Sequence, residues 1–150
     1  MPLLSRLIAA LALIAALAVP ALAREEIRAF ASDVELLADG SVSVLETIDV
    51  NAEGNQIRRG IYRDIPVTMI GESGNKIRIN LDVEAVTRGG QPEMFRVERM
   101  GDFRRIWIGD PDVFLRRGEH RYTISYTMDR MARPTADGSG DELYWNATGN

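Results

Sequence analysis

Apolar and polar side chains alternate along most of the chain from residue 27 onward. The clearest example is residues 41–50, where Val42, Val44, Ile48 and Val50 share one face and small polar side chains occupy the other. A period of two residues is typical of a β-strand with one buried face. Similar runs, separated by turn-forming residues, occupy residues 27–37, 57–66, 76–87, 95–99, 104–108, 113–115, 121–128 and 142–146.

These runs predict about seven or eight short antiparallel strands, and no segment after residue 23 has a convincing helical period. Short strands at regular spacing are typical of a β-sandwich. The sequence therefore predicts an all-β fold, an antiparallel immunoglobulin-like β-sandwich. Residues 76–87 are expected to form one strand, and residues 132–140 a loop. The apolar face of the strand at 76–87 would carry Ile77, Ile79, Leu81, Val83 and Ala85.

Two turns sharpen this prediction. Asp39-Gly40 lies between two apolar-patterned segments, which is a strong indication of a β-hairpin. Tyr122 opens an alternating strand directly after a tight turn at Gly118. Immunoglobulin-like domains place a tyrosine at such a point, where its hydroxyl binds the backbone a few residues upstream. Tyr122 is thus a candidate tyrosine corner; a tyrosine simply packed on a sheet fits the pattern equally well.

The first 23 residues differ from the rest. Arg6 precedes an apolar run over residues 7–19, and Pro20-Ala21-Leu22-Ala23 ends in a small-residue cleavage box. This pattern predicts a signal-peptide helix at 1–23, followed by one exported domain at 24–150. The apolar run is shorter than the roughly 20 residues that cross a bilayer core, so an uncleaved membrane anchor is the weaker interpretation.

Composition narrows the function classes. The leader holds one of the 18 basic residues and none of the 22 acidic ones, so residues 24–150 carry a net charge of −5. A nucleic-acid-binding domain would be basic, and no nucleic-acid partner is expected. The chain has no cysteine, so an exported domain must be stabilised by its core and not by disulfides.

Glu46 is the exception to the alternation at 41–50, because its carboxylate falls on the apolar face. A buried carboxylate needs a partner, since an unpaired buried charge is costly. Arg63, in the segment Arg59-Gly-Ile-Tyr-Arg-Asp-Ile-Pro66, is the expected partner. We expect a structural ion pair and predict that Glu46→Ala destabilises the domain.

No metal or cofactor is expected. Asp110 and Asp112, joined by Asp141 and Glu142, could offer oxygens to calcium, but their spacing is not that of a calcium loop, and an Asp-Pro turn needs no metal. His120 is the single histidine, and no cysteine is available to complete a zinc site. Its position at a strand start predicts a solvated surface residue.

No catalytic constellation stands out either. Paired-carboxylate chemistry through Asp64, Asp110 or Glu142 is left as an alternative, although short loops offer little room for a substrate cleft. Tyr144 and Trp145 could stack on a sugar ring or lie at a membrane surface. They could equally close the sandwich as a final core strand, which is the interpretation we favour.

Four segments resemble one family in sequence and order: Asp39 to Ile48, Arg59 to Pro66, Ile108 to Val113 and Glu142 to Gly149. The chain is similar to the uncharacterised bacterial membrane proteins grouped as domain of unknown function 2207. The resemblance implies an N-terminal domain outside the cytoplasmic membrane, tethered by transmembrane helices beyond residue 150. It implies no activity, and it suggests that these residues are part of a longer protein.

Taken together, the sequence predicts a non-catalytic binding, sensing or scaffolding head of a bacterial membrane protein. Its partner would be an envelope protein or polymer on the periplasmic or extracellular side of the membrane. A periplasmic enzyme acting on envelope polymers, and a free secreted inhibitor or adhesin, are the alternatives.

Overall fold

A computed structural model describes residues 24–71, 73–135, 137–143 and 145. The leader at 1–23 lies outside these residues. The described chain is all-β, as predicted, and every strand pairing is antiparallel. The strands are β1 (Glu26–Leu36), β2 (Val42–Ala52), β3 (Ile61–Pro66), β4 (Thr68–Ile70), β5 (Lys76–Arg78), β6 (Leu81–Arg88), β7 (Gln91–Pro92), β8 (Phe95–Met100), β9 (Phe103–Ile108), β10 (Gly118–Met128), β11 (Ala132–Pro134) and β12 (Asp141–Leu143).

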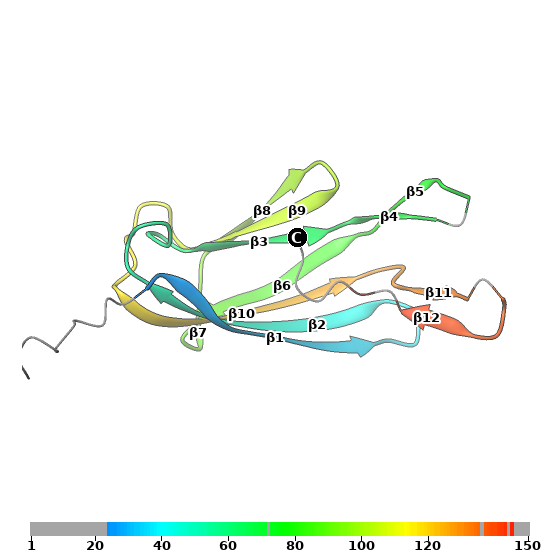
Figure 1. The fold of residues 1–150 in the computed structure, drawn as a ribbon, viewed down its shortest axis with the longest axis horizontal. Coiled ribbons are helices and arrows are strands. Elements are labelled where there is room, and N and C mark those ends of the chain that lie inside the picture. The colour runs from blue at the N-terminus through cyan, green and yellow to red at the C-terminus, as the bar shows by residue number, and fades with distance from the viewer. Residues whose placement is uncertain (1–23, 72, 136, 144, 146–150) are drawn as a thin grey trace, which may run out of the picture.

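Two sheets form the layers of the sandwich (Figure 1). The larger has the order β1-β2-β10-β6-β7, and the smaller has the order β3-β9-β8. Two short hairpins, β4-β5 and β11-β12, extend from the end opposite to the start of β1 (Figure 1). In the part of the chain that the structure describes, no helix is long and apolar enough to cross a membrane.

The predicted core faces are confirmed in β2 and β10. Every second side chain of β2 from Val42 to Val50 is buried, and Glu46 is buried among them. On β10 the buried set is Tyr122, Ile124, Tyr126 and Met128. The smaller sheet completes the core with Ile65, Ile106 and Ile108. Burial of these apolar side chains is the main force that holds the two sheets together.

The buried face predicted for residues 76–87 is wrong after Glu84, because the strand contains a β-bulge at that residue. Ser125 of β10 pairs with Ala85, whereas the next residue, Tyr126, pairs with Val83, so Glu84 is the extra residue. The extra residue reverses the alternation. As a result Val86 is buried and Ala85 is exposed, opposite to what strict alternation predicts.

The boundaries of four predicted segments were wrong. Residues 76–87 form two strands, because the Ile79 N–H binds the Val67 carbonyl and the Asn80 N–H binds Asp129 Oδ1. Residues 113–115 form no strand, since the preceding turn holds the chain through Asp110. The expected loop at 132–140 contains β11, which pairs with β12. The strand predicted at 57–66 begins only at residue 61.

Two glycines set how closely β3 approaches β9. A Cβ on Gly60 would lie 1.8 Å from the Ile108 carbonyl oxygen, and one on Gly109 would lie 2.1 Å from the Arg59 carbonyl oxygen. Both residues have positive φ angles, 149° and 119°. Only glycine fits at these two positions, because any larger residue would push β3 and β9 apart.

Candidate functional site on the open side of the sandwich

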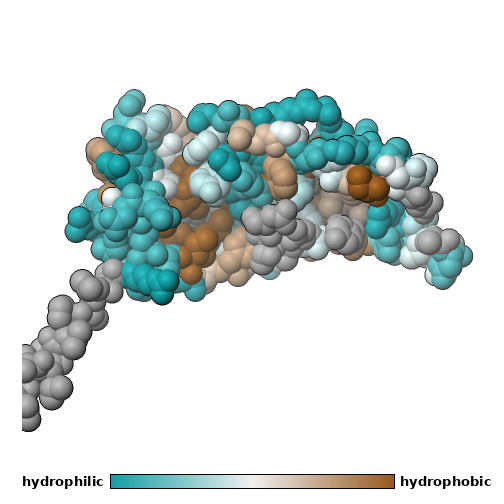
Figure 2. Space-filling view, turned by 45° about the horizontal axis from the view of Figure 1, so that its top comes forward, coloured by the Kyte–Doolittle hydropathy of each residue, from teal (hydrophilic) through white to brown (hydrophobic). Residues whose placement is uncertain are grey.

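The side between β1 and β3 is where the sandwich is open. Each of these strands is the edge of its sheet, and no described strand pairs with either outer edge. A groove of about 730 Å³ runs between them. Its apolar lining comes from Ile27, Phe30, Ile48, Val50, Ile57 and Ile61. Figure 2 shows apolar surface collected between the two layers toward the end where β1 begins.

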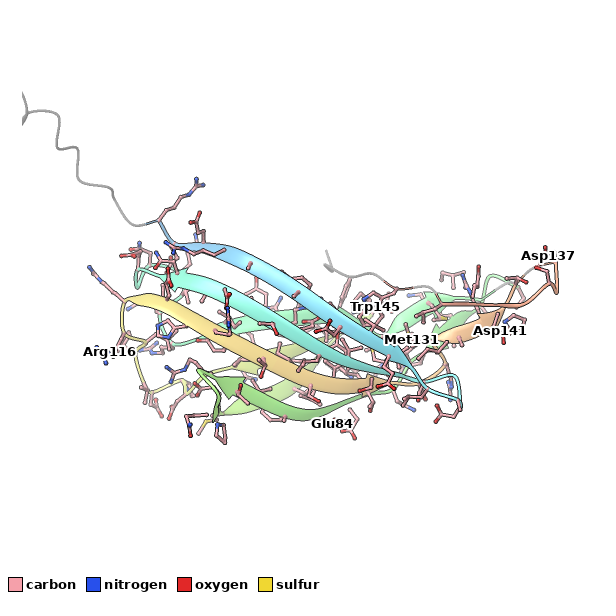
Figure 3. All side chains as sticks on the ribbon, turned by 90° about the horizontal axis from the view of Figure 1, so that it is seen from below. Glu84, Arg116, Met131, Asp137, Asp141 and Trp145 are labelled. Carbon is pink, nitrogen blue, oxygen red and sulfur yellow. The ribbon has the colours of Figure 1, made fainter. Side chains whose placement is uncertain are left out.

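A second cavity of about 380 Å³ lies further along, toward the β4-β5 hairpin. Its lining includes Ile65, Tyr126, Met131 and Trp145. Figure 3 shows Trp145 and Met131 at this part of the molecule. Arg63 lines both cavities, so its side chain separates them.

The structure brings Glu46 and Arg63 together. Arg63 Nε donates to Glu46 Oε2 at 2.8 Å, and Arg63 Nη2 donates to Oε1 at 2.8 Å. The Tyr126 hydroxyl donates to the same Oε1 at 2.9 Å. Glu46 is 0% exposed and Arg63 is 9% exposed. The carboxylate thus receives three hydrogen bonds in a site closed to water, which is how a buried charge is made tolerable.

The contacts with Glu46 contribute to the pKa values of Arg63 and Tyr126. Burial opposes the charge on Arg63, but hydrogen bonding to Glu46 and its negative charge outweigh burial and raise the pKa of Arg63. Burial, followed by the charge of Glu46, raises the pKa of the Tyr126 hydroxyl. Because both pKa values are raised, Arg63 and Tyr126 keep their protons near neutral pH. The arrangement therefore suits a structural clamp between the two sheets better than acid–base chemistry.

Arg63 makes two further contacts at the groove wall. Its Nη1 donates to the Asp64 carbonyl at 2.9 Å, and its guanidinium carbon lies 5.4 Å from the centre of the Phe30 ring. Since Phe30 belongs to β1 and Arg63 to β3, the contact between Arg63 and the Phe30 ring joins the two edge strands across the open side.

The hydrogen-bond register shows which backbone groups of β1 face outward. The Leu37 N–H binds the Ser41 carbonyl at 2.8 Å, which makes these two residues a hydrogen-bonded pair. Pairs in an antiparallel ladder alternate between bonded and non-bonded. The ladder then places the bonded pairs at residues 35, 33 and 31, so the backbone groups of Leu36, Val34, Ser32 and Phe30 point away from β2. These groups form a row along the free edge of β1, which begins at the groove with Phe30.

Asp64 borders the groove, and its side chain alternates with the buried side chains of Arg63 and Ile65, so it lies on the outer face of the smaller sheet. Its two carboxylate oxygens accept hydrogen bonds from Arg105 Nε and Nη2, each at 2.7 Å. These bonds hold the pKa of Asp64 below its usual range. Arg105 also lies 4.1 Å from the centre of the Tyr62 ring and 5.1 Å from that of Trp107. Asp64 is therefore committed to an ion pair within an aromatic and arginine ladder.

The remaining acidic candidates are not brought together. Asp110 Oδ1 accepts the Asp112 N–H at 2.8 Å, as expected of a turn, and Glu142 pairs with Arg133 at 2.7 Å. Figure 3 shows Asp141 at the opposite end of the molecule from Arg116, which follows the Asp110–Asp112 turn by four residues. Across the described residues, no three histidine, cysteine, aspartate or glutamate side chains form a possible metal site.

The aromatic and histidine candidates have these places. Tyr122 is 0% exposed, and its hydroxyl has no hydrogen-bond partner among the described residues, so the tyrosine-corner prediction was wrong. Burial raises its pKa to about 12. His120 Nε2 lies 2.6 Å from the Arg116 carbonyl oxygen at the start of β10. Trp145 packs on the core without belonging to a strand, and Tyr144 lies outside the described residues.

Sequence reasoning missed two partners in these networks. The alternation at 121–128 does not predict the bond from Tyr126 to Glu46, although both residues lie on buried faces of adjacent strands. The pairing of Asp64 with Arg105 depends on the register between β3 and β9, which no local pattern gives. A polar position on a buried face was the one signal that could be used, and it pointed to Glu46.

The fold and this site define a small antiparallel sandwich domain whose core is clamped by an ion pair. The chain belongs to the family described as the N-terminal domain of predicted membrane proteins, DUF2207, which matches residues 26–150 and confirms the resemblance. It is 32% identical over 126 residues to the uncharacterized protein YciQ of Escherichia coli strain K12. That alignment covers 84% of this chain and 20% of YciQ, so the chain spans about a fifth of its relative. No solved structure matches.

Proposed function

We propose that this domain is a non-catalytic binding head of a membrane protein, located outside the cytoplasmic membrane, and that it holds an extended segment of an envelope protein along the free edge of β1. The observation that carries the proposal is the outward row of backbone groups from Phe30 to Leu36, which begins at the apolar groove with Phe30. An extended peptide that adds to a sheet edge gains its affinity from such backbone groups, and pockets for alternate side chains give specificity.

The pairing of three candidate carboxylates with arginines supports a non-catalytic role. Glu46, Asp64 and Glu142 are each paired with an arginine. General acid–base catalysis by paired carboxylates requires two such groups on either side of a bound substrate. Turnover of an envelope polymer that is abolished by Asp64→Asn or Glu142→Gln, with the fold intact, would contradict this part of the proposal.

Photo-crosslinking in the host envelope tests the binding edge. In the whole membrane protein, p-benzoylphenylalanine would replace either Ala31 of β1 or Thr47 of β2. These two residues are register partners on the same face of the sheet, and Ala31 is one strand closer to the free edge. We expect a specific adduct from position 31 and none from position 47. Mass spectrometry should then locate the adduct in one extended segment of another envelope protein.

A proline variant separates binding from mere proximity. Ser32→Pro removes an outward N–H that is not needed by β2, and edge strands tolerate proline at such positions. The adduct should be lost in Ser32→Pro and retained in Ser32→Ala. An adduct that survives Ser32→Pro contradicts strand addition, and an adduct within the same polypeptide means that the groove is filled by the protein itself.

The proposed side of the membrane has its own test. Alkaline phosphatase folds only where disulfides form. Its fusion behind residue 150 of the full leader-containing chain should be active in cells. An inactive fusion, together with an active cytoplasmic reporter at the same site, would place the domain on the other side.

A further inference from the structure

One end of the molecule combines arginine with exposed apolar side chains. This end is formed by the starts of β1 and β10 and the end of β2, since Glu26 pairs with Asn51 and Gly118 with Ala52. Two loops, residues 53–60 and 109–117, complete it. We name as the arginine tip four arginines and two apolar residues that are exposed in these loops: Arg58, Arg59, Val113, Phe114, Arg116 and Arg117.

The two loops form one surface. The Leu115 N–H donates to the Arg58 carbonyl at 2.8 Å, which ties the loops together. The guanidinium carbons of Arg58 and Arg59 lie 5.5 Å and 4.4 Å from the centre of the Phe114 ring. Phe114 is 57% exposed and the neighbouring Val113 is 52% exposed. An aromatic ring on a loop tip, exposed and flanked by cations, is not explained by the core.

Most of the carboxylates near this end have partners within the fold, although the exposed Asp112, beside Val113, forms no ion pair among the described residues. Glu25 accepts backbone hydrogen bonds from the loop at Glu53, Gln56 and Ile57. Asp110 accepts the N–H of Asp112. Glu119 pairs with Arg28. By contrast, no carboxylate within the described chain forms an ion pair with the four arginines of the tip.

We propose that the arginine tip rests on the surface of an anionic phospholipid bilayer, with the arginines at the phosphate groups and Phe114 and Val113 in the headgroup region. Basic side chains next to exposed apolar ones are the combination that binds membrane interfaces, and each arginine near an anionic surface strengthens binding about fivefold. The inference goes beyond the proposed function and does not depend on the β1 edge, which faces the side of the sandwich. It would hold the domain end-on on the membrane surface.

Site-specific fluorescence on the chain of residues 1–150 tests the tip. Because the chain has no cysteine, Val113→Cys gives a unique site for an environment-sensitive nitrobenzoxadiazole label. Ser139→Cys, in the loop between β11 and β12 at the other end, is the matched control. With vesicles of phosphatidylethanolamine and phosphatidylglycerol, the label at 113 should shift to the blue and the label at 139 should not. Vesicles of phosphatidylcholine alone should give a much smaller shift.

Variants separate the tip from the apolar leader, because every variant keeps residues 1–23. Arg116→Gln with Arg117→Gln should weaken the response at position 113 by at least about tenfold in lipid concentration, and high salt should do the same. Arg133→Gln at the far end should leave it unchanged. Equal shifts at 113 and 139, or a shift that survives the double arginine variant, would overturn the proposal. So would a shift that native membranes produce and pure lipid does not, because the partner would then be a protein.

Discussion

Glu46 of β2 and Arg63 of β3 face each other across the interior of the sandwich and share two hydrogen bonds of 2.8 Å. The pair crosses between the two sheets at the wall that separates the two cavities. A buried pair of this kind does not by itself make a protein stable, since both charges lose their hydration. It does fix which residues of the two sheets lie opposite each other.

The first prediction follows from that pair. Glu46→Leu or Arg63→Met should each lower the free energy of unfolding by about 3–5 kcal/mol, because each leaves one buried charge without its partner. The double variant Glu46→Leu with Arg63→Met should lose much less than the sum of the single variants. Urea titrations of the four proteins measure this coupling.

A surface pair provides the control for that cycle. Arg121 and Asp49 form a bidentate pair at 2.7 Å, but 66% of the Arg121 side chain is exposed. Its double-mutant cycle should show far weaker coupling. Coupling of equal size in the two cycles would show that Glu46 and Arg63 are not buried together.

The two core tyrosines of β10 give a matched comparison. Tyr126→Phe removes a hydrogen bond to a buried carboxylate and should cost about 1.5–3 kcal/mol. Tyr122→Phe removes a buried hydroxyl without a partner among the described residues, so it should be neutral or stabilising. Thermal unfolding distinguishes the two. A larger loss for Tyr122→Phe than for Tyr126→Phe would contradict the assignment of the hydroxyl partners.

Two glycines with the same backbone angle separate steric contact from strain. Gly109 and Gly118 have φ angles of 119° and 116°. Alanine at 118 would meet no atom within 4 Å and should cost about 1–3 kcal/mol from strain alone. Alanine at 109 also collides with the Arg59 carbonyl, so it should cost clearly more. Equal losses would mean that β3 and β9 can move apart freely.

Acid should weaken the outer face of the smaller sheet through Asp64. Hydrogen bonds from Arg105 lower the pKa of Asp64 in the folded state below the value of about 3.9 in an unfolded chain. The folded state therefore binds fewer protons, so the pair stabilises the fold fully above the unfolded pKa, and this contribution is lost as the pH falls through the folded pKa. Unfolding measured from pH 6 downward should show a shallower acid limb for Asp64→Asn.

The control for that measurement is Asp112→Asn. The Asp112 carboxylate forms no ion pair among the described residues, so this variant should keep the slope of the unchanged protein. Identical acid limbs for Asp64→Asn and the unchanged protein would show that the Arg105 pair contributes nothing to stability.

Local patterns predicted the strands whose two faces differ most. The alternation around Glu46 identified both the buried face of β2 and the one charged residue within it. The bulge at Glu84 was beyond such reasoning, because one extra residue depends on the neighbouring strand and not on the segment itself. The strand β11 was also missed, since its pairing with β12 joins residues across a polar loop.

The site itself was predicted only in part. The buried carboxylate and its arginine could be foreseen because a charge on an apolar face requires a partner. The groove could not, since it results from two sheets that end at β1 and β3 on the same side of the molecule. The ladder around Arg105 likewise needs the register of three strands.

Two adjacent proline variants of the whole protein test whether an extended partner adds to β1. The amide of Ser32 points outward and the amide of Asp33 points toward Leu45 of β2. Ser32→Pro should keep the melting temperature near that of Ser32→Ala and abolish the crosslink from position 31, whereas Asp33→Pro should unfold the edge itself. A stable Ser32→Pro protein that still forms the full yield of adduct would contradict the addition of a strand to β1.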